Sequence, residues 1–264
     1  MKIVHLHGFK CAGSTFSWVL QKIYGDKLLY VEGKNSNKRL ALDTLNSNVD
    51  IDLYSAITSH TLEYPHQHYD DLFFVDFVRN PYERLISAYK FQKKVGQIPA
   101  DTNYKQYLQE HVGTERENYM TRCLSPQTFT DQNIWPISKE SVPISSKNLF
   151  VGSVDYFDES LVLLEILLKD KFSLDIDLSY PAPLNVSDKS AIANSYEIDE
   201  DIASKIINRD TILSLKVNYL ILHSIVNIPD FSNKLKDFRD RCKSLRGIDT
   251  SNVKIKSPSE WVIL

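Results

Sequence analysis

The chain has 264 residues, a length that fits one α/β domain with a sizeable core or two smaller domains, and we expect a single domain over 1–264. Its hydrophobic content of 42% and charged content of 25% are ordinary for soluble proteins, and no apolar run approaches the roughly 20 residues that span a bilayer. The net charge of −3 excludes a global attraction to nucleic acid or anionic lipid, so an anion has to be bound by a local site.

Cysteine usage and the first residues predict the compartment. Cys11, Cys123 and Cys242 are odd in number, widely spaced and in no C-x-x-C arrangement, which is typical of reduced thiols in a cytoplasm. The first residues, KIVHL, read as a strand and leave no room for the apolar segment of a signal peptide. We therefore expect a cytoplasmic protein without stable membrane insertion.

The first predicted unit is a strand, a loop and a helix. KIVHL (2–6) leads into GFKCAGST (8–15), and STFSWVLQKIYG (14–25) has apolar residues at helical spacing. The loop is almost a phosphate-binding G-x-x-x-x-G-K-[ST] motif, but Ser14 stands where that motif has its lysine. The lysine in this loop is Lys10, four residues earlier, so the spacing argues against an ordinary nucleotide-hydrolysing loop.

A second strand, turn and helix follow. SAITS (55–59) is a short strand candidate before His60, and LFFVDFV (72–78) is apolar enough for burial on both faces. Arg79, Asn80 and Pro81 come next, and proline is favoured at the first position of a helix. The sequence therefore predicts a helix over 82–94 directly after Arg79.

The remaining elements complete an α/β pattern. Helices are predicted at 103–111, 117–124 and 159–169, a buried strand at 148–153, a surface loop at 178–198 and further helices in the C-terminal quarter. Strands alternating with helices indicate a mostly parallel sheet flanked by helices. We expect a core over about 1–160 and a helix-rich C-terminal part over about 195–264.

Two separate anion sites are predicted where strands hand over to helices, which is where open α/β sheets bind ligands. In the first, amides around Gly13–Thr15 lie at the positive end of a helix dipole, beside Lys10. In the second, the guanidinium of Arg79 can donate two hydrogen bonds to a phosphate, and Ser87 adds a hydroxyl. Two separate sites indicate a ligand that carries phosphates at two places.

Two motifs carry a resemblance to a known family. HGFKCAGSTF (7–16) resembles the H-x-P-K-T-[AG]-G-T-S-F loop of carbohydrate sulfotransferases, and FVDFVRNPYERLISAY (74–89) resembles their F-[TV]-[FV]-[LV]-R-D-P-x-E-R-x-x-S-x-Y segment. Weaker similarities follow in ENYMTRCLS, FVGSVDYFDESLVLL and LNVS, and almost nothing matches from about Asn194 onward. The type resembled is heparan sulfate 2-O-sulfotransferase-like, of sulfotransferase family 2.

This resemblance implies the P-loop-like sulfotransferase fold and 3′-phosphoadenosine 5′-phosphosulfate (PAPS) as cofactor, with 3′,5′-adenosine diphosphate (PAP) as product. It implies that Lys10 contacts the bridging oxygen and that Arg79 and Ser87 bind the 3′-phosphate. The implied remaining cofactor contacts, including the 5′-phosphate, come from the loop: Cys11, Ala12, Gly13, Ser14 and Thr15. Gly8 and Phe9 depart from the family's aliphatic residue and proline, and Asn80 replaces an aspartate without losing the ability to cap a helix.

Sulfuryl transfer to an alcohol requires a base, and His60 is the first candidate because it matches the [GS]-H that the family places upstream of its arginine motif. Glu63, His66 and His68 are the alternatives, and Glu63 is also a candidate to orient His60. His5 and His7 together with His66 and His68 invite a zinc site, but no cysteine or carboxylate has supporting spacing, so we predict no metal. His7 is interpreted as bracing the loop, and Trp18, Trp135 and Trp261 as packing residues.

We therefore predict a cytoplasmic, bacterial or phage-like, metal-independent enzyme that sulfates a hydroxyl acceptor, with a sugar hydroxyl of a glycan or glycolipid as the best candidate. Nucleic acid is not an expected partner, and the sequence does not predict the oligomeric state. Two alternatives remain open at this point. One is a nucleotide-dependent kinase with a degenerate loop, and the other is a non-catalytic adenine-nucleotide-binding protein.

Overall fold

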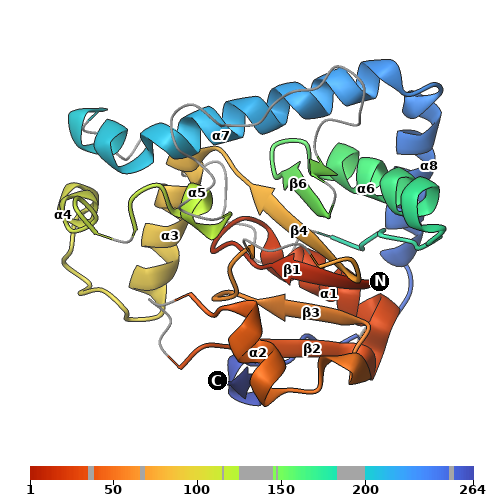
Figure 1. Ribbon diagram of the computed structural model, residues 1–264. Helices are drawn as coiled ribbons and strands as arrows, with labels where there is room; N and C mark the ends of the chain where they lie inside the picture. Colours follow the sequence, from red (N-terminus) through yellow and green to blue (C-terminus); the bar gives the residue numbers. More distant parts are fainter. Residues whose placement is uncertain are drawn as a thin grey trace.

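A seven-stranded sheet forms the centre of the molecule, in the order β5-β6-β4-β1-β3-β2-β7 (Figure 1). The computed structural model describes residues 1–34, 39–65, 69–114, 116–124, 145–146, 148–182, 200–249 and 253–264. Neighbouring strands pair in parallel, except that β5 is antiparallel to β6. The strands are β1 Lys2–Leu6, β2 Leu28–Glu32, β3 Ala56–Ser59, β4 Leu72–Val78, β5 Ser145–Ser146, β6 Leu149–Ser153 and β7 Val262–Ile263.

Helices flank the sheet and dominate the C-terminal part, as predicted. The α7 helix runs along one outer edge of the molecule, packs against α3, α5, α6 and β6, and is followed by α8 (Figure 1). The α/β class and the mostly parallel sheet are confirmed, whereas the single-domain assignment stays a prediction. The helices are α1 Gly13–Tyr24, α2 Leu42–Asn48, α3 Pro81–Lys94, α4 Tyr104–Gln109, α5 Tyr119–Cys123, α6 Phe157–Phe172, α7 Glu200–Asn227 and α8 Phe231–Leu245.

The second strand-turn-helix unit forms for the reasons that its sequence suggested. All seven residues of β4 are buried, as expected for a strand covered on both faces. Pro81 stands at the start of α3, and the side chain of Asn80 accepts hydrogen bonds from the amides of Tyr82 and Glu83. Asn80 is therefore the helix cap, and it fixes where the chain turns after Arg79.

Four strands and helices were missing from the prediction, and the two-residue strand β5 is one of them. The strand β2 and the helix α2 lie within residues 26–54, which the sequence pattern left unassigned. The strand β7 is only two residues long, and it returns the C-terminal end of the chain to the sheet beside β2. The C-terminal quarter is helical, as predicted, and this additional strand was not expected because a strand this short carries no readable periodicity.

The register of the sheet aligns the ends of its three central strands. Leu6 at the end of β1 lies opposite Ser59 of β3 and Asp76 of β4. His7, His60 and Arg79, which follow these strands, therefore emerge at the same edge of the sheet.

The described helices do not include one that is long and apolar enough to cross a membrane by itself. Taken together, α7 and α8 are long and apolar enough to cross one, but the two helices are bent by 109° at their junction.

Candidate active site

The loop between β1 and α1 has a strained backbone. Lys10 and Ala12 have φ angles of 65° and 59°, in the left-handed region that residues other than glycine seldom adopt. Such conformations cost on the order of 1–3 kcal/mol each and cluster at ligand sites. The α1 helix starts at Gly13 without a side-chain cap, so the positive end of its dipole faces this loop.

His7 braces the loop, as predicted, and it does so against the first residue of α1. A Cβ atom added to Gly13 would lie 1.8 Å from Cδ2 of the His7 ring, so only glycine leaves room for the histidine. Ser17 lies 3.4 Å from Nδ1 of both His5 and His7 and 3.2 Å from the hydroxyl of Thr58. This buried polar network fixes the loop to the two neighbouring strands.

Two cations converge beside the loop. Arg79 pairs with Glu83 at 3.0 Å, and its guanidinium also lies 3.5 Å from the carbonyl oxygen of Lys10. The Lys10 ammonium lies 4.6 Å from the centre of the Phe91 ring. Burial lowers the pKa of Lys10, and the positive charge of Arg79 lowers it further. Burial and a neighbouring positive charge both disfavour the charged ammonium, and a bound anion would offset them.

The other predicted cofactor residues occupy different surroundings. Ser87 is buried in α3, and no hydrogen bond joins it to Arg79. Thr15 is buried in the first turn of α1, beside Ser14. The Cys11 side chain is also buried, and burial raises the pKa of its thiol, which excludes a reactive thiolate. The backbone N–H of Cys11 donates to the carbonyl oxygen of Gly8 at 3.1 Å, and the binding roles of all these residues stay predictions.

His60 lies in a stack of aromatic rings. Its ring centre is 3.9 Å from that of His7 and 4.9 Å from that of Trp261. Nδ1 of His60 is 2.5 Å from Oε1 of Glu32, and the backbone N–H of His60 donates to the same oxygen at 2.9 Å. Arg39 donates to the carbonyl oxygen of His60. The sequence analysis missed Glu32 because it left β2 unassigned.

Of the three histidines near the loop, His60 is the most accessible. Its side chain is 35% exposed, whereas His5 and His7 are almost fully buried. Burial lowers the pKa of His5 to about 3 and that of His7 well below its usual value, with His60 contributing in both cases. His5 and His7 are therefore neutral at physiological pH and serve as packing partners.

Glu63, His66 and His68 were the other candidates for the base. The carboxylate that contacts His60 is Glu32, not Glu63, whose backbone amide donates to the carbonyl oxygen of Leu40. His66 and His68 lie outside the described residues. Among the residues that the structure describes, no group of three or more His, Cys, Asp or Glu side chains is arranged to hold a metal ion. The choice of base stays a prediction.

A buried aromatic and cationic group, also missed from the sequence, supports the loop. The guanidinium carbons of Arg39 and Arg84 lie 5.1 Å and 5.0 Å from the centre of the Tyr119 ring. The backbone N–H of Phe9 donates to the hydroxyl of Tyr119 at 3.2 Å. The α5 helix therefore holds the loop in place through Tyr119.

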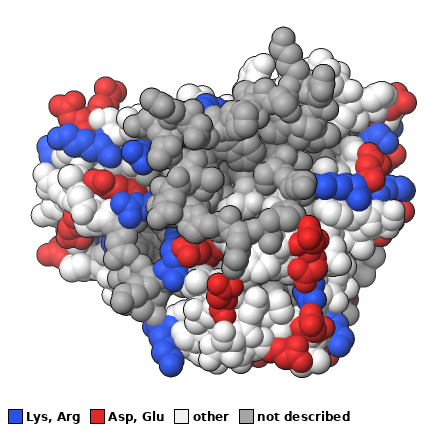
Figure 2. All heavy atoms as spheres, in the orientation of Figure 1, with Lys and Arg blue, Asp and Glu red and all other residues white. Residues whose placement is uncertain are grey.

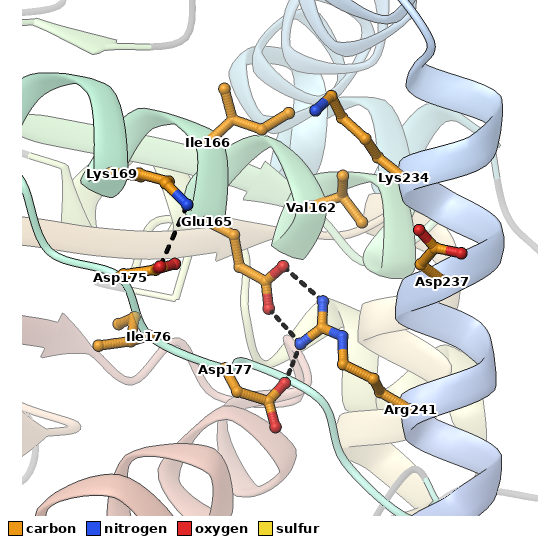
Figure 3. Close-up of a pocket in the computed structure, with 10 residues that line it drawn as sticks. All are labelled: Val162, Glu165, Ile166, Lys169, Asp175, Ile176, Asp177, Lys234, Asp237 and Arg241. Atoms are coloured by element: carbon orange, nitrogen blue, oxygen red, sulfur yellow. Dashed lines mark hydrogen bonds and ion pairs between the residues drawn. The ribbon is translucent and has the colours of Figure 1, made fainter.

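A separate pocket of about 450 Å³ lies between α6 and α8 (Figure 3). Arg241 bonds to both Glu165 and Asp177 there, and Lys169 pairs with Asp175. These charges neutralise one another, and none of the site residues predicted from the sequence lines this pocket. On the face shown in Figure 2, acidic and basic side chains of the described residues are interspersed. The two anion sites predicted from the sequence, at the loop and at Arg79, are separate from this pocket.

Comparison with known proteins gives two findings. The model of the sulfotransferase family matches residues 1–146, more than half of the chain, and this range includes every residue predicted for the site. An uncharacterized protein of Archaeoglobus fulgidus is 24% identical over 189 residues, an alignment that covers 64% of this chain and 74% of that protein.

Proposed function

Because the chain belongs to the sulfotransferase family, which implies PAPS-dependent transferase activity, we propose that it moves the sulfuryl group of PAPS to a hydroxyl of a carbohydrate acceptor. Within the family, we propose the heparan sulfate 2-O-sulfotransferase-like type, on the resemblance of HGFKCAGSTF and FVDFVRNPYERLISAY to that type. The same resemblance supports a sugar hydroxyl of a glycan or glycolipid as the acceptor. Family membership favours this function over the kinase and the non-catalytic alternatives.

The observation that carries the proposal is the convergence of three features at one edge of the sheet. The strained loop with Lys10, the guanidinium of Arg79 and the imidazole of His60 follow three neighbouring strands. Sulfuryl transfer to an alcohol requires groups that bind the anionic cofactor and a base that accepts the proton of the hydroxyl. Their meeting at one edge supports a catalytic site there.

The residues present fit a phosphosulfate ligand. Burial lowers the pKa of Lys10 and the positive charge of Arg79 lowers it further, and an anion bound at Lys10 would offset both effects. The α1 helix starts without a side-chain cap, and the positive end of its dipole favours an anion there. PAPS, when bound, supplies the activated sulfuryl group.

Each residue then has a defined task. His60 accepts the proton of the acceptor hydroxyl as its oxygen attacks sulfur. Lys10 donates to the phosphate oxygen that leaves when its bond to sulfur breaks, and it neutralises the charge that grows there. Arg79, with Ser87, binds the 3′-phosphate, so that the reacting groups are held in line. We propose that these steps need no metal ion and take place in the cytoplasm.

Transfer of radiolabelled sulfate from PAPS to a panel of glycans and glycolipids tests this function. We expect label on at least one carbohydrate, a rate at least about 100-fold lower in Lys10→Ala, and a loss of about 100-fold or more in His60→Ala. The matched controls are Lys169→Ala, in an exposed ion pair with Asp175, and His223→Ala, exposed on α7, and both should retain the parent rate. Transfer at full rate by Lys10→Ala would contradict the proposed role of the loop.

A further inference from the structure

The carboxylate of Glu32 holds His60 at two points. Oε1 of Glu32 accepts from the backbone N–H of His60 at 2.9 Å and lies 2.5 Å from Nδ1 of the same residue. The Glu32 side chain is only 16% exposed, so water competes weakly for these bonds. An ionised carboxylate can accept hydrogen bonds but cannot donate them. The proton between Oε1 of Glu32 and Nδ1 of His60 therefore belongs on Nδ1 of the neutral ring.

Two rings pack against the ring of His60. Trp261 stacks on it with an angle of 12° between the ring planes, and the ring centre of His7 lies 3.9 Å away. A ring held by an edge bond and packed against two other rings has little rotational freedom. Its remaining nitrogen, Nε2, points away from the bond with Glu32.

The C-terminal end of the chain supplies this stacking contact. The strand β7 pairs with β2 so that Glu32 lies opposite Ile263, and the N–H of Leu264 donates to the carbonyl oxygen of Glu32 at 2.8 Å. The indole N–H of Trp261 donates to the carbonyl oxygen of Lys256, and its ring centre lies 5.2 Å from that of Tyr30. Glu32 and Trp261 therefore belong to one paired unit, although 228 intervening residues separate them in the sequence.

The charged groups around His60 come from several elements. Glu32 approaches from β2, His7 from the loop after β1, and Arg39 bonds the carbonyl oxygen of His60. His5 and His7 are neutral, and Trp261 contributes no charge. Glu32 is therefore the acidic group in direct contact with the ring among the residues described.

We infer that Glu32 and Trp261 are positioning residues, which fix His60 as its Nδ1–H tautomer and direct Nε2 toward the acceptor hydroxyl. This inference rests on the proposed function for its catalytic consequence, but not for the tautomer itself. A neutral imidazole in water favours the Nε2–H form. An Nδ1–H form of His60 would therefore show that the surrounding residues determine its tautomer.

Nitrogen-15 NMR of the full chain at about pH 9 reads the tautomer directly, because imidazoles are then neutral. The His60 signals are assigned by their loss in His60→Asn. We expect the Nδ1–H form in the parent protein and a shift toward Nε2–H in Glu32→Ala. Glu32→Gln should keep the Nδ1–H form, since the backbone N–H of His60 requires an acceptor at Oε1 and holds the amide oxygen there.

Steady-state kinetics provides the second readout. We expect Glu32→Ala to lower kcat about 10- to 100-fold with the KM for PAPS unchanged, and Glu32→Gln to recover at least part of that loss. Trp261→Ala should lower kcat and Trp261→Phe should recover it, because phenylalanine keeps a flat apolar face. Glu260→Gln is the matched control, since Glu260 is exposed and bonds Ser257 rather than His60.

The outcomes separate the two claims. The positioning role would be overturned by an Nε2–H tautomer in the parent protein or by an unchanged tautomer in Glu32→Ala. A kcat that is equally low in Glu32→Ala and Glu32→Gln would overturn it as well. If the tautomer behaves as expected but the parent protein sulfates no acceptor, the positioning geometry stands and the proposed function fails.

Discussion

At the scale of single residues, Asp76 is a buried acid that lies beside the loop. It lies on β4, its Oδ1 accepts from the amide of Phe77 at 2.7 Å, and a Cβ atom on Gly8 would lie 3.4 Å from the same oxygen. Burial raises the pKa of Asp76 to about 7, although the Phe77 amide and Arg39 oppose this rise. The protonated form is therefore favoured in the folded state, and ionisation at higher pH opposes folding.

This gives a pH-dependent prediction. Because the folded-state pKa of Asp76 is above its unfolded value of 3.8, its contribution to stability is fully present below about pH 4 and is lost as pH rises through 7. Asparagine cannot ionise but still accepts from the Phe77 amide. The free energy of unfolding of Asp76→Asn, measured with urea from pH 4 to 8, should therefore rise relative to the parent protein as pH increases. A difference that stays constant over this range would contradict the prediction, and exposed Asp26→Asn is the control.

At the scale of elements, the turn from β4 into α3 depends on one cap. Asn80→Ala removes the acceptor for the amides of Tyr82 and Glu83, and it should lower the free energy of unfolding by about 1 kcal/mol. Asn80→Asp, which restores the residue of the resembled family, should be close to neutral. Urea unfolding of the three proteins gives the comparison, and an alanine variant as stable as the parent would show that the cap adds nothing.

The elements differ in how far the sequence predicted them. The β4 strand and the α3 helix were predicted because LFFVDFV is long and apolar and Pro81 and Asn80 mark a helix start. The β2 strand, LLYVE, was not assigned, and the two residues of β7 are too short to show any pattern. Glu32 and Trp261 were missed or given only a packing role for this reason, since their proximity to His60 arises from sheet pairing between distant segments.

At the scale of the whole molecule, the sequence predicted the class of fold, and the location of the site at the ends of the central strands stays a prediction. The sequence did not predict which side chains pack around the residues of the predicted site. Arg39, Arg84 and Tyr119 come from three segments and meet beneath the loop, and Phe91 lies beside the ammonium of Lys10. Such contacts depend on tertiary packing, which no local spacing encodes.

The measurement that most directly tests the central claim is calorimetric titration of the protein with PAP, compared with ATP and magnesium. The account predicts micromolar binding of PAP in preference to ATP, weakened at least about tenfold, or about 1.4 kcal/mol, by Arg79→Ala and unchanged by Arg241→Ala in the pocket between α6 and α8. Preference for ATP with magnesium would contradict the assignment of this site to PAPS, and PAP binding that Arg79→Ala leaves unaltered would contradict the assignment of Arg79 to the 3′-phosphate.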